Sequence, residues 1–125
     1  MQKYLLLSLV LFLTIGGCSQ STSVKEDIKK LSPNILMDKA AERYSVYDYK
    51  NALMYYQAVL DNYPESYEDV AWARYEMGYI YYIQKKYNKS KEYFEAAAAS
   101  KNAPHAVIIL SEMMLSKLPT QSISK

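Results

Sequence analysis

Few residues in this chain of 125 residues have the chemistry that catalysis needs. His105 is the only histidine, and a zinc site around one imidazole without a neighbouring cysteine would need several carboxylates to converge on it. As a general base, His105 has no nucleophile near it in sequence. Glu65, Glu68 and Asp69 lie close together at an expected helix start, where carboxylates stabilise the positive end of the helix dipole. The sequence has no glycine-rich phosphate loop either, so we expect no enzymatic activity, no metal and no cofactor.

The only cysteine, Cys18, follows a segment typical of secretory signal peptides. Lys3 supplies a positive charge, residues 4–15 are mostly apolar, and Gly16 and Gly17 come directly before the cysteine. The apolar run is too short to cross a bilayer as a helix, which needs about 20 residues. The motif Ile15-Gly16-Gly17-Cys18 resembles the lipobox of bacterial lipoproteins, in which only small side chains let the peptidase approach the backbone.

This resemblance implies that residues 1–17 are a signal peptide and that Cys18 receives a diacylglycerol group and becomes the mature N-terminus. Two acyl chains give stable membrane attachment, and a lipidated cysteine leaves no thiol for a disulfide, a metal site or a nucleophile. The alternatives are an ordinary signal peptide with an incidental cysteine, or an uncleaved anchor. Removing Lys3 with the leader changes the formal charges from 15 against 13 to 14 against 13, so charge gives no argument for nucleic acid as a partner.

Helical patterns fill most of the remaining chain. Residues 18–32 are polar without a sustained apolar period, and we interpret them as a lipidated tether. Ser32 and Pro33 form a helix-start signal, and Ser66 with Asp69 has capping-box spacing. The sequence predicts five helices, at about 34–46, 49–61, 67–84, 87–100 and 104–117, before a flexible tail at 118–125. No period-two alternation bounded by turn residues occurs, so the predicted fold class is all-α.

Two stretches repeat one pattern 38 residues apart. In both, aromatic and small residues recur at steps of three, four and three, which is the spacing of one helix face. The matching positions are Tyr49, Ala52, Tyr56 and Val59 in the first stretch, and Tyr87, Ser90, Phe94 and Ala97 in the second. Repetition at this period is typical of helical arrays, in which each unit buries its apolar face against the next.

The helix before each stretch completes a pattern that resembles the tetratricopeptide repeat. That family has an apolar residue followed by glycine, a tyrosine three residues later, small and aromatic residues on the second helix, and a closing proline. The further matches are Met77, Gly78 and Tyr81 in the second unit, and Ala40 and Pro64 in the first. The chain departs from the family at Arg43, where tyrosine is preferred, and at Arg74, where a large apolar residue is common. Its 38-residue offset also exceeds the usual 34.

The resemblance implies two helix-turn-helix repeats and a C-terminal capping helix, which together form a right-handed α-solenoid fragment. The repeats would cover about 33–66 and 71–104 and the capping helix about 104–117, within a domain at 33–117. The longer offset, with the residues around 62–66, resembles the repeats of outer-membrane-associated helical lipoproteins and periplasmic proteins. Examples are the lipoprotein of the β-barrel assembly machinery and the periplasmic coordinator of envelope constriction.

In this family the first helix of each unit lines a concave surface that binds proteins. By the resemblance, the lining positions are Trp72, Tyr75, Tyr79, Tyr82 and Ile83 in the second unit, and Met37, Ala41 and Tyr44 in the first. The three tyrosines of the second unit lie at i, i+4 and i+7 and form one stripe, whose rings and hydroxyls suit a peptide helix or extended segment. The alternative is that the preceding unit or a second copy of the chain covers this stripe.

Five lysines cluster around the turn before the predicted helix at about 87–100 and on the outer face of that helix. They are Lys85, Lys86, Lys89, Lys91 and Lys101. We interpret them as a solvated helix face, and the alternative is a site for an anionic partner or a lipid headgroup.

Together these features predict a membrane-anchored adaptor for protein–protein interaction in the bacterial cell envelope. It would face the periplasm from an outer membrane, if the source has two membranes. Its partner would be another envelope protein or peptide segment, and not a nucleic acid. The alternatives are a self-associating structural lipoprotein, which would be a homo-oligomer, and an accessory component of outer-membrane protein assembly.

Overall fold

Every main regular element within residues 27–119, the part that the computed structural model describes, is a helix. The helices are α2 (Pro33–Ser45), α3 (Tyr49–Asn62), α4 (Tyr67–Ile83), α5 (Tyr87–Ala98) and α6 (His105–Lys117). The all-α prediction is confirmed, and each predicted helix end lies within two residues of the observed one. The predicted signal peptide, the lipidation of Cys18, residues 18–26 of the tether and residues 120–125 of the tail lie outside the described residues.

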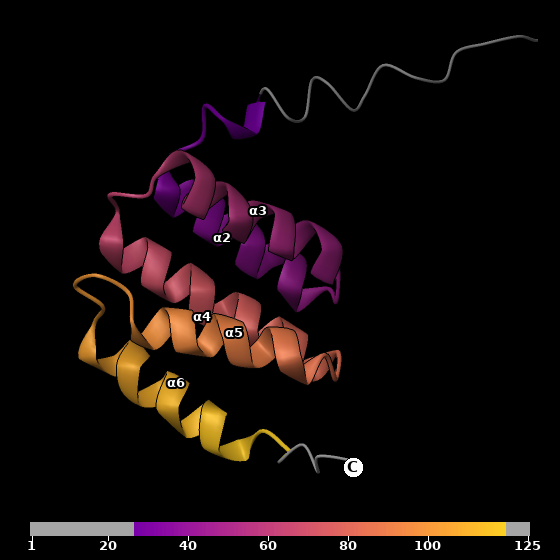
Figure 1. Cartoon of the computed structure of the whole chain (residues 1–125). Coiled ribbons are helices and arrows are strands. Elements are labelled where there is room, and N and C mark those ends of the chain that lie inside the picture. The colour runs from indigo at the N-terminus through magenta and orange to yellow at the C-terminus, as the bar shows by residue number, and fades with distance from the viewer. Residues whose placement is uncertain (1–26, 120–125) are drawn as a thin grey trace, which may run out of the picture.

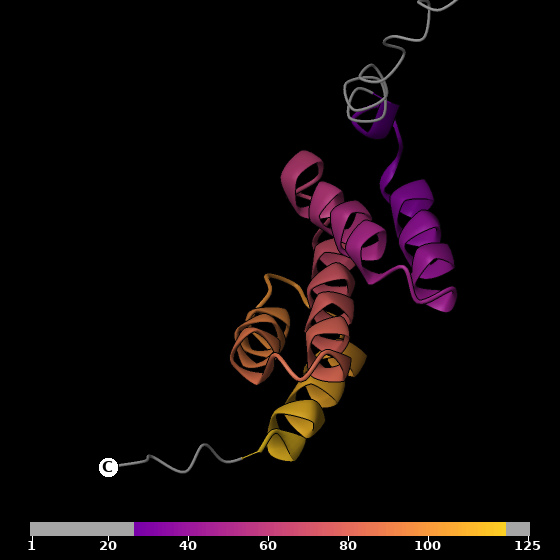
Figure 2. The same cartoon turned by 90° about the vertical axis from the view of Figure 1, so that its right-hand side faces the viewer.

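Successive helices pack against one another from one end of the molecule to the other (Figure 1). α2 packs on α3, α3 on α4, α4 on α5 and α5 on α6. Helices two places apart also touch, since α4 contacts both α2 and α6. The turned view shows α4 between the α2/α3 pair and the helices α5 and α6 (Figure 2). The central helix α4 therefore contacts all four of the others.

The turn between α2 and α3 has the same geometry as the turn between α4 and α5. Tyr47 and Lys85, which are 38 positions apart, have φ angles of 61° and 59°, in the left-handed region. Two backbone amides in each turn donate to carbonyls of the preceding helix, an arrangement that closes many helix ends. These bonds run from Tyr47 to Tyr44 and from Asp48 to Arg43 in the first turn, and from Lys85 to Tyr82 and from Lys86 to Tyr81 in the second, each at 2.9 Å. The two turns therefore share one backbone geometry at the same 38-residue offset as the sequence pattern. Neither turn contains the glycine that a left-handed φ angle usually requires.

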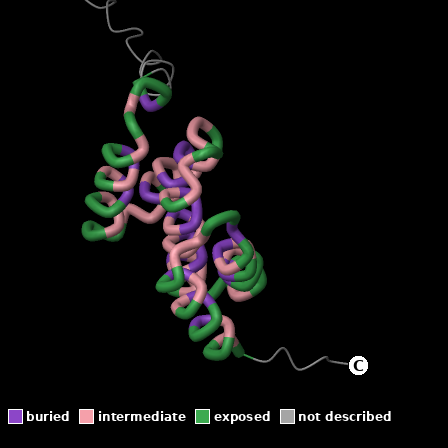
Figure 3. Tube along the Cα trace, turned by 90° about the vertical axis from the view of Figure 1, so that its left-hand side faces the viewer, coloured by how far each residue is buried: buried purple, intermediate pink, exposed green. Residues whose placement is uncertain are grey.

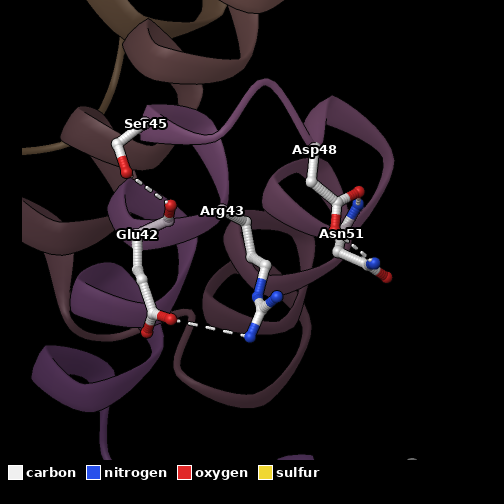
Figure 4. A network of polar contacts seen from close by, with 5 residues as sticks. All are labelled: Glu42, Arg43, Ser45, Asp48 and Asn51. Carbon is white, nitrogen blue, oxygen red and sulfur yellow. Dashed lines mark hydrogen bonds and ion pairs between the residues drawn. The ribbon is translucent and has the colours of Figure 1, made fainter.

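The starts of α3 and α4 are held in different ways. Asp48 caps α3, because its Oδ1 accepts from the Asn51 amide at 3.3 Å and its Oδ2 accepts from Asn51 Nδ2 at 2.7 Å (Figure 4). These bonds from Asn51 hold the pKa of Asp48 below its usual range. At α4 the predicted capping box is wrong, because the Ser66 side chain makes no cap hydrogen bond. The backbone angles do not explain the difference, because those of Ser66 (φ −79°, ψ 69°) and of the capping Asp48 (φ −82°, ψ 66°) are nearly alike.

Small residues lie where α4 and α5 meet. Gly78 is buried, and a Cβ added to it would lie 2.9 Å from Cδ1 of Phe94. Ser90 is fully buried, and its Oγ donates to the Gly78 carbonyl oxygen at 2.9 Å. The equivalent positions of the α2/α3 pair are Ala40 and Ala52, which are also fully buried. The predicted small residues therefore occupy the contact between paired helices.

Most of the residues assigned to packing from the repeat pattern are buried. The buried ones are Ala40, Ala52, Tyr56, Val59, Met77, Gly78, Ser90, Phe94 and Ala97. Tyr49, Tyr81 and Tyr87 are half-buried and Pro64 is exposed. Figure 3 shows the buried residues along the lines where helices meet and the exposed ones on the outer turns. Tyr49 and Tyr87 are the first residues of α3 and α5, and their rings contact Tyr44 and Tyr82 of the preceding helices.

The two arginines that depart from the family pattern are both accommodated. Arg43 forms an ion pair with the adjacent Glu42 at 3.6 Å, on a solvent-facing part of α2 (Figure 4). Arg74 extends from α4 to the end of α5, where its Nη1 donates to Ser100 Oγ at 2.9 Å and lies 3.5 Å from the Ala96 carbonyl oxygen. A cation at this end of α5 meets the partial negative charge of the helix dipole, so Arg74 replaces apolar packing with an electrostatic contact.

Packed structure begins before the predicted start of the domain. Ile28 is buried in the core between α2, α3 and α4. The carbonyl oxygen of Leu31 accepts a 2.7 Å hydrogen bond from the hydroxyl of Tyr63, which follows α3. These contacts attach the last residues of the predicted tether to the helices.

Candidate protein-interaction face

The predicted stripe on α4 meets one tyrosine of α2. Tyr79 and Tyr82 stack with their ring centroids 6.2 Å apart. Tyr44 of α2 lies within electrostatic range of Tyr79, because its pKa is raised first by burial and then by the charge of Tyr79. All three tyrosines are half-buried. We call Tyr44, Tyr79 and Tyr82 the tyrosine face.

Trp72 and Tyr75, at the other end of the stripe, belong to the packing around α6. They form an edge-to-face pair with ring centroids 5.9 Å apart, and the ring of Tyr75 lies 5.6 Å from that of Phe94. Both pack against the small cluster of Ala71, Ala97 and Val107, which joins α4, α5 and α6. Trp72 and Tyr75 are half-buried, as is the tyrosine face, so the two parts of the stripe differ in what they pack against and not in their exposure.

The other predicted lining residues differ in how exposed they are. Ile83, directly after Tyr82, is 38% exposed, and Ala41 on α2 is also exposed. Met37 is half-buried and packs on the core between α2, α3 and α4. The structure thus keeps Ala41 and Ile83 accessible, whereas Met37 contributes mainly to packing.

Glu76 is the residue of this region that the sequence analysis missed. It is half-buried on α4, and burial raises the pKa of its carboxyl group. Its negative charge contributes to the raised pKa values of Tyr44 on α2, Tyr56 on α3 and Tyr75 on α4. The signal for it was present, because Glu76 stands four residues after Trp72 and three before Tyr79, the spacing of one helix face.

This arrangement suits the binding of protein side chains. Tyr44, Tyr79 and Tyr82 are only half-buried, and each carries a hydroxyl that can donate a hydrogen bond. Aromatic rings with a polar end combine apolar contact area with directional bonds, and few rotatable bonds are lost when they are fixed. Glu76, which stands three residues before Tyr79 on α4, adds a carboxylate acceptor to this side of the helix.

The remaining candidates form no comparable group. His105 is exposed at the first position of α6, and no set of three potential metal ligands converges anywhere in residues 27–119. Among the lysines, Lys86 and Lys89 approach the Tyr81 ring at 5.9 and 5.4 Å. Lys91 pairs with Glu95 at 3.6 Å, and Lys101 lies 4.3 Å from the centre of the Tyr67 ring. These contacts give Lys86, Lys89, Lys91 and Lys101 partners on the chain's own surface, which fits a solvated face.

None of the helices in the described part of the chain combines the length and the apolar character that crossing a membrane requires. Comparison of the chain with protein-family models, with curated proteins and with solved structures found no match.

Proposed function

We propose that the chain is a membrane-anchored tetratricopeptide-repeat lipoprotein that acts as a protein–protein interaction adaptor in the bacterial cell envelope. The repeat assignment is supported by the paired helices α2/α3 and α4/α5, whose left-handed turns at Tyr47 and Lys85 recur at the 38-residue offset. It is also supported by the small residues at equivalent contacts, Ala40 with Ala52 and Gly78 with Ser90. The lipid anchor rests on the lipobox-like motif at Cys18.

The tyrosine face is the observation that carries the adaptor function. Tyr44, Tyr79 and Tyr82 present aromatic surface from two helices that touch each other, and all three stay half-exposed. Rigid helices fix the positions of these rings, so a partner segment does not have to order them on binding. Aromatic side chains of this kind are enriched among the residues that dominate protein interfaces.

The test is partner capture by the membrane-anchored full chain, with quantitative mass spectrometry of the recovered proteins. The variant Tyr79→Ala with Tyr82→Ala should lose about tenfold or more of the specific partner signal, because central aromatic contacts contribute on the order of 2 kcal/mol each. Tyr67→Ala is the matched control, since Tyr67 is a half-buried α4 tyrosine whose hydroxyl contacts Glu65 instead. Equal recovery by all three chains would show that the tyrosine face is not the binding surface.

Self-association is a second candidate, favoured by the outer face of α6. Ile109 and Met113, one helical turn apart, are 50% and 41% exposed, whereas Val107, Ser111 and Met114 on the opposite face are buried. Large exposed apolar side chains on one helix face are typical of a surface that meets another protein. Sedimentation velocity at two concentrations separates the candidates: a sedimentation coefficient that rises with concentration, and no longer does so in Ile109→Asn, would support self-association.

A further inference from the structure

The last helix of the stack, α6, has apolar residues on every side but is covered on one side only. Eight of its 13 residues are apolar, and it has one acidic and one basic residue. A helix that is apolar all round is typically covered on all sides. Within residues 27–119, α4 and α5 cover the side that contains Val107, Ser111 and Met114 (Figure 1). The opposite side is therefore a helix face that no other described helix covers.

The residues of this uncovered face follow the spacing of a coiled-coil seam. Ala106, Ile109, Met113 and Ser116 lie at steps of three, four and three, and all four are exposed. We call these four residues the α6 seam. Its large members, Ile109 and Met113, are 50% and 41% exposed. Ser116 Oγ already donates to the Met113 carbonyl oxygen of its own helix at 2.7 Å, so covering this hydroxyl would break no hydrogen bond.

The two charged residues of α6 flank the seam on opposite sides. Glu112 immediately precedes Met113, and Lys117 immediately follows Ser116, so they occupy the g and e positions of the heptad pattern. Both are exposed. In a parallel helix pair, a g residue of one helix meets the e residue five places later in the other, so Glu112 would meet Lys117 of a second copy. In an antiparallel pair g faces g and e faces e, which would bring like charges together.

We propose that two copies of the chain associate through a parallel pair of α6 helices, with the α6 seam between them. This inference rests on the self-association candidate proposed above and specifies its surface and its direction. A two-fold axis along the seam packs Ile109 and Met113 against their counterparts and forms the pair of Glu112 with Lys117 twice. The seam spans fewer than two heptads, so the pair is weak in dilute solution, and the proposed membrane anchor favours it by concentrating the copies.

Crosslinking tests the direction of the pair. Ile109→Cys and Ser116→Cys change two seam positions that are about 10 Å apart along the helix. In a parallel pair each new thiol lies opposite its own counterpart, so mild oxidation of the full chain in membranes should crosslink both single variants. An antiparallel pair can bring at most one of the two positions to its counterpart.

Two controls accompany the crosslinking. The unchanged chain contains Cys18 alone, and Glu92→Cys places a thiol at an exposed position of α5. Neither should crosslink above the level of random collision. Crosslinking of only one seam variant or of neither, or equal crosslinking of Glu92→Cys, would overturn the proposal.

Charge reversal tests the flanking pairs. Glu112→Lys and Lys117→Glu each replace attraction by repulsion on both sides of the axis, so each should raise the dissociation constant about tenfold. Sedimentation velocity of the full chain in detergent measures this change. An equimolar mixture of the two variants should recover the association, because opposite charges then meet again. Glu92→Lys is the matched control on α5, and equal weakening by it, or no weakening by the α6 reversals, would contradict the proposed pairing.

The same measurements separate this inference from the self-association candidate. If the sedimentation coefficient rises with concentration and Ile109→Asn abolishes the rise, while the seam variants do not crosslink, the parallel pair is wrong and self-association stands. If the coefficient is independent of concentration and neither seam variant crosslinks, both fail, and a different protein or a lipid surface is left to cover α6. Partner capture by the tyrosine-face variants decides the adaptor function in either case.

Discussion

The Oγ of Ser90 donates a hydrogen bond of 2.9 Å to the backbone carbonyl oxygen of Gly78, and this bond joins α5 to α4 where both helices have small residues. Ser90 is fully buried, and the ring of Phe94 packs directly over Gly78. Paired helices can approach this closely only if neither residue carries a larger side chain. The contact therefore sets the geometry of the α4/α5 pair.

Gly78→Ala should destabilise the chain. A new Cβ would lie 2.9 Å from Cδ1 of Phe94, which is fully buried and has little room to move. Overpacking typically costs about 1–3 kcal/mol, whereas replacing a helical glycine with alanine returns about 1 kcal/mol, so the free energy of unfolding should fall by up to about 2 kcal/mol. Urea unfolding measures the change. The double variant Gly78→Ala with Phe94→Leu should lose less stability than the sum of the losses in the two single variants, because the smaller side chain at position 94 relieves the clash.

The packing of α6 predicts opposite outcomes for two nearby apolar residues. Val107→Ala should lower the free energy of unfolding by about 1–3 kcal/mol, since Val107 is fully buried against α4 and α5 and its truncation leaves a cavity. Ile109→Ala should change it by less than about 0.5 kcal/mol, because Ile109 is half-exposed. Thermal or urea unfolding of the two variants makes the comparison. Similar losses in both would mean that α6 packs through a different face.

Glu76 should make the folded chain less stable as the pH rises. Burial raises its pKa above that of the unfolded chain, so the folded chain binds more protons at pH values between the usual glutamate pKa and the raised one. Stability contributed by the neutral carboxyl is therefore present below that interval and is lost as the pH rises through it. Glu76→Gln should be more stable than the unchanged chain at neutral pH, and the difference should vanish in acid.

Urea unfolding of both chains from about pH 4 to about pH 8 checks this prediction, with Glu112→Gln as the exposed control. A Glu76→Gln chain that is less stable at neutral pH would show that the carboxylate has a stabilising partner.

Cys18→Ser tests the lipid anchor, which concerns residues outside the described helices. Without the thiol no diacylglycerol thioether can form, so the chain should leave the membrane fraction or accumulate as an uncleaved precursor. Fractionation followed by intact-mass measurement shows both effects. A fully processed Cys18→Ser chain that stays in the membrane fraction would contradict the lipobox interpretation.

Local patterns predicted the helices and their paired contacts well, because apolar and small residues repeat at helical spacing. Gly78 and Ser90 could be assigned to the contact between α4 and α5 from the sequence, and both are buried there. The sequence misled at Ser66, whose side chain makes no cap hydrogen bond although its backbone angles are close to those of Asp48, which does cap its helix. It also treated Tyr75 as equivalent to Tyr79, although only the tertiary structure shows that Tyr75 packs against the cluster that joins α4, α5 and α6.

The role of Glu76 depends on tertiary structure in a similar way. A glutamate in a helix is exposed far more often than not, so its type alone points to solvent. Its environment comes from Tyr44 and Tyr56, which belong to two other helices. Spacing placed Glu76 on the face of α4 with the tyrosines, but only the contacts between α2, α3 and α4 place it among partly buried hydroxyls.

The stacking of helices in chain order also determines how the fold can form. The substantial helix contacts join elements that are one or two places apart in the chain. Only short loops have to close before each contact forms, which costs little chain entropy and is characteristic of rapidly folding proteins. Each helix can therefore dock as soon as the one before it is in place, and a chain that emerges slowly from its N-terminal end can begin to fold before α6 appears.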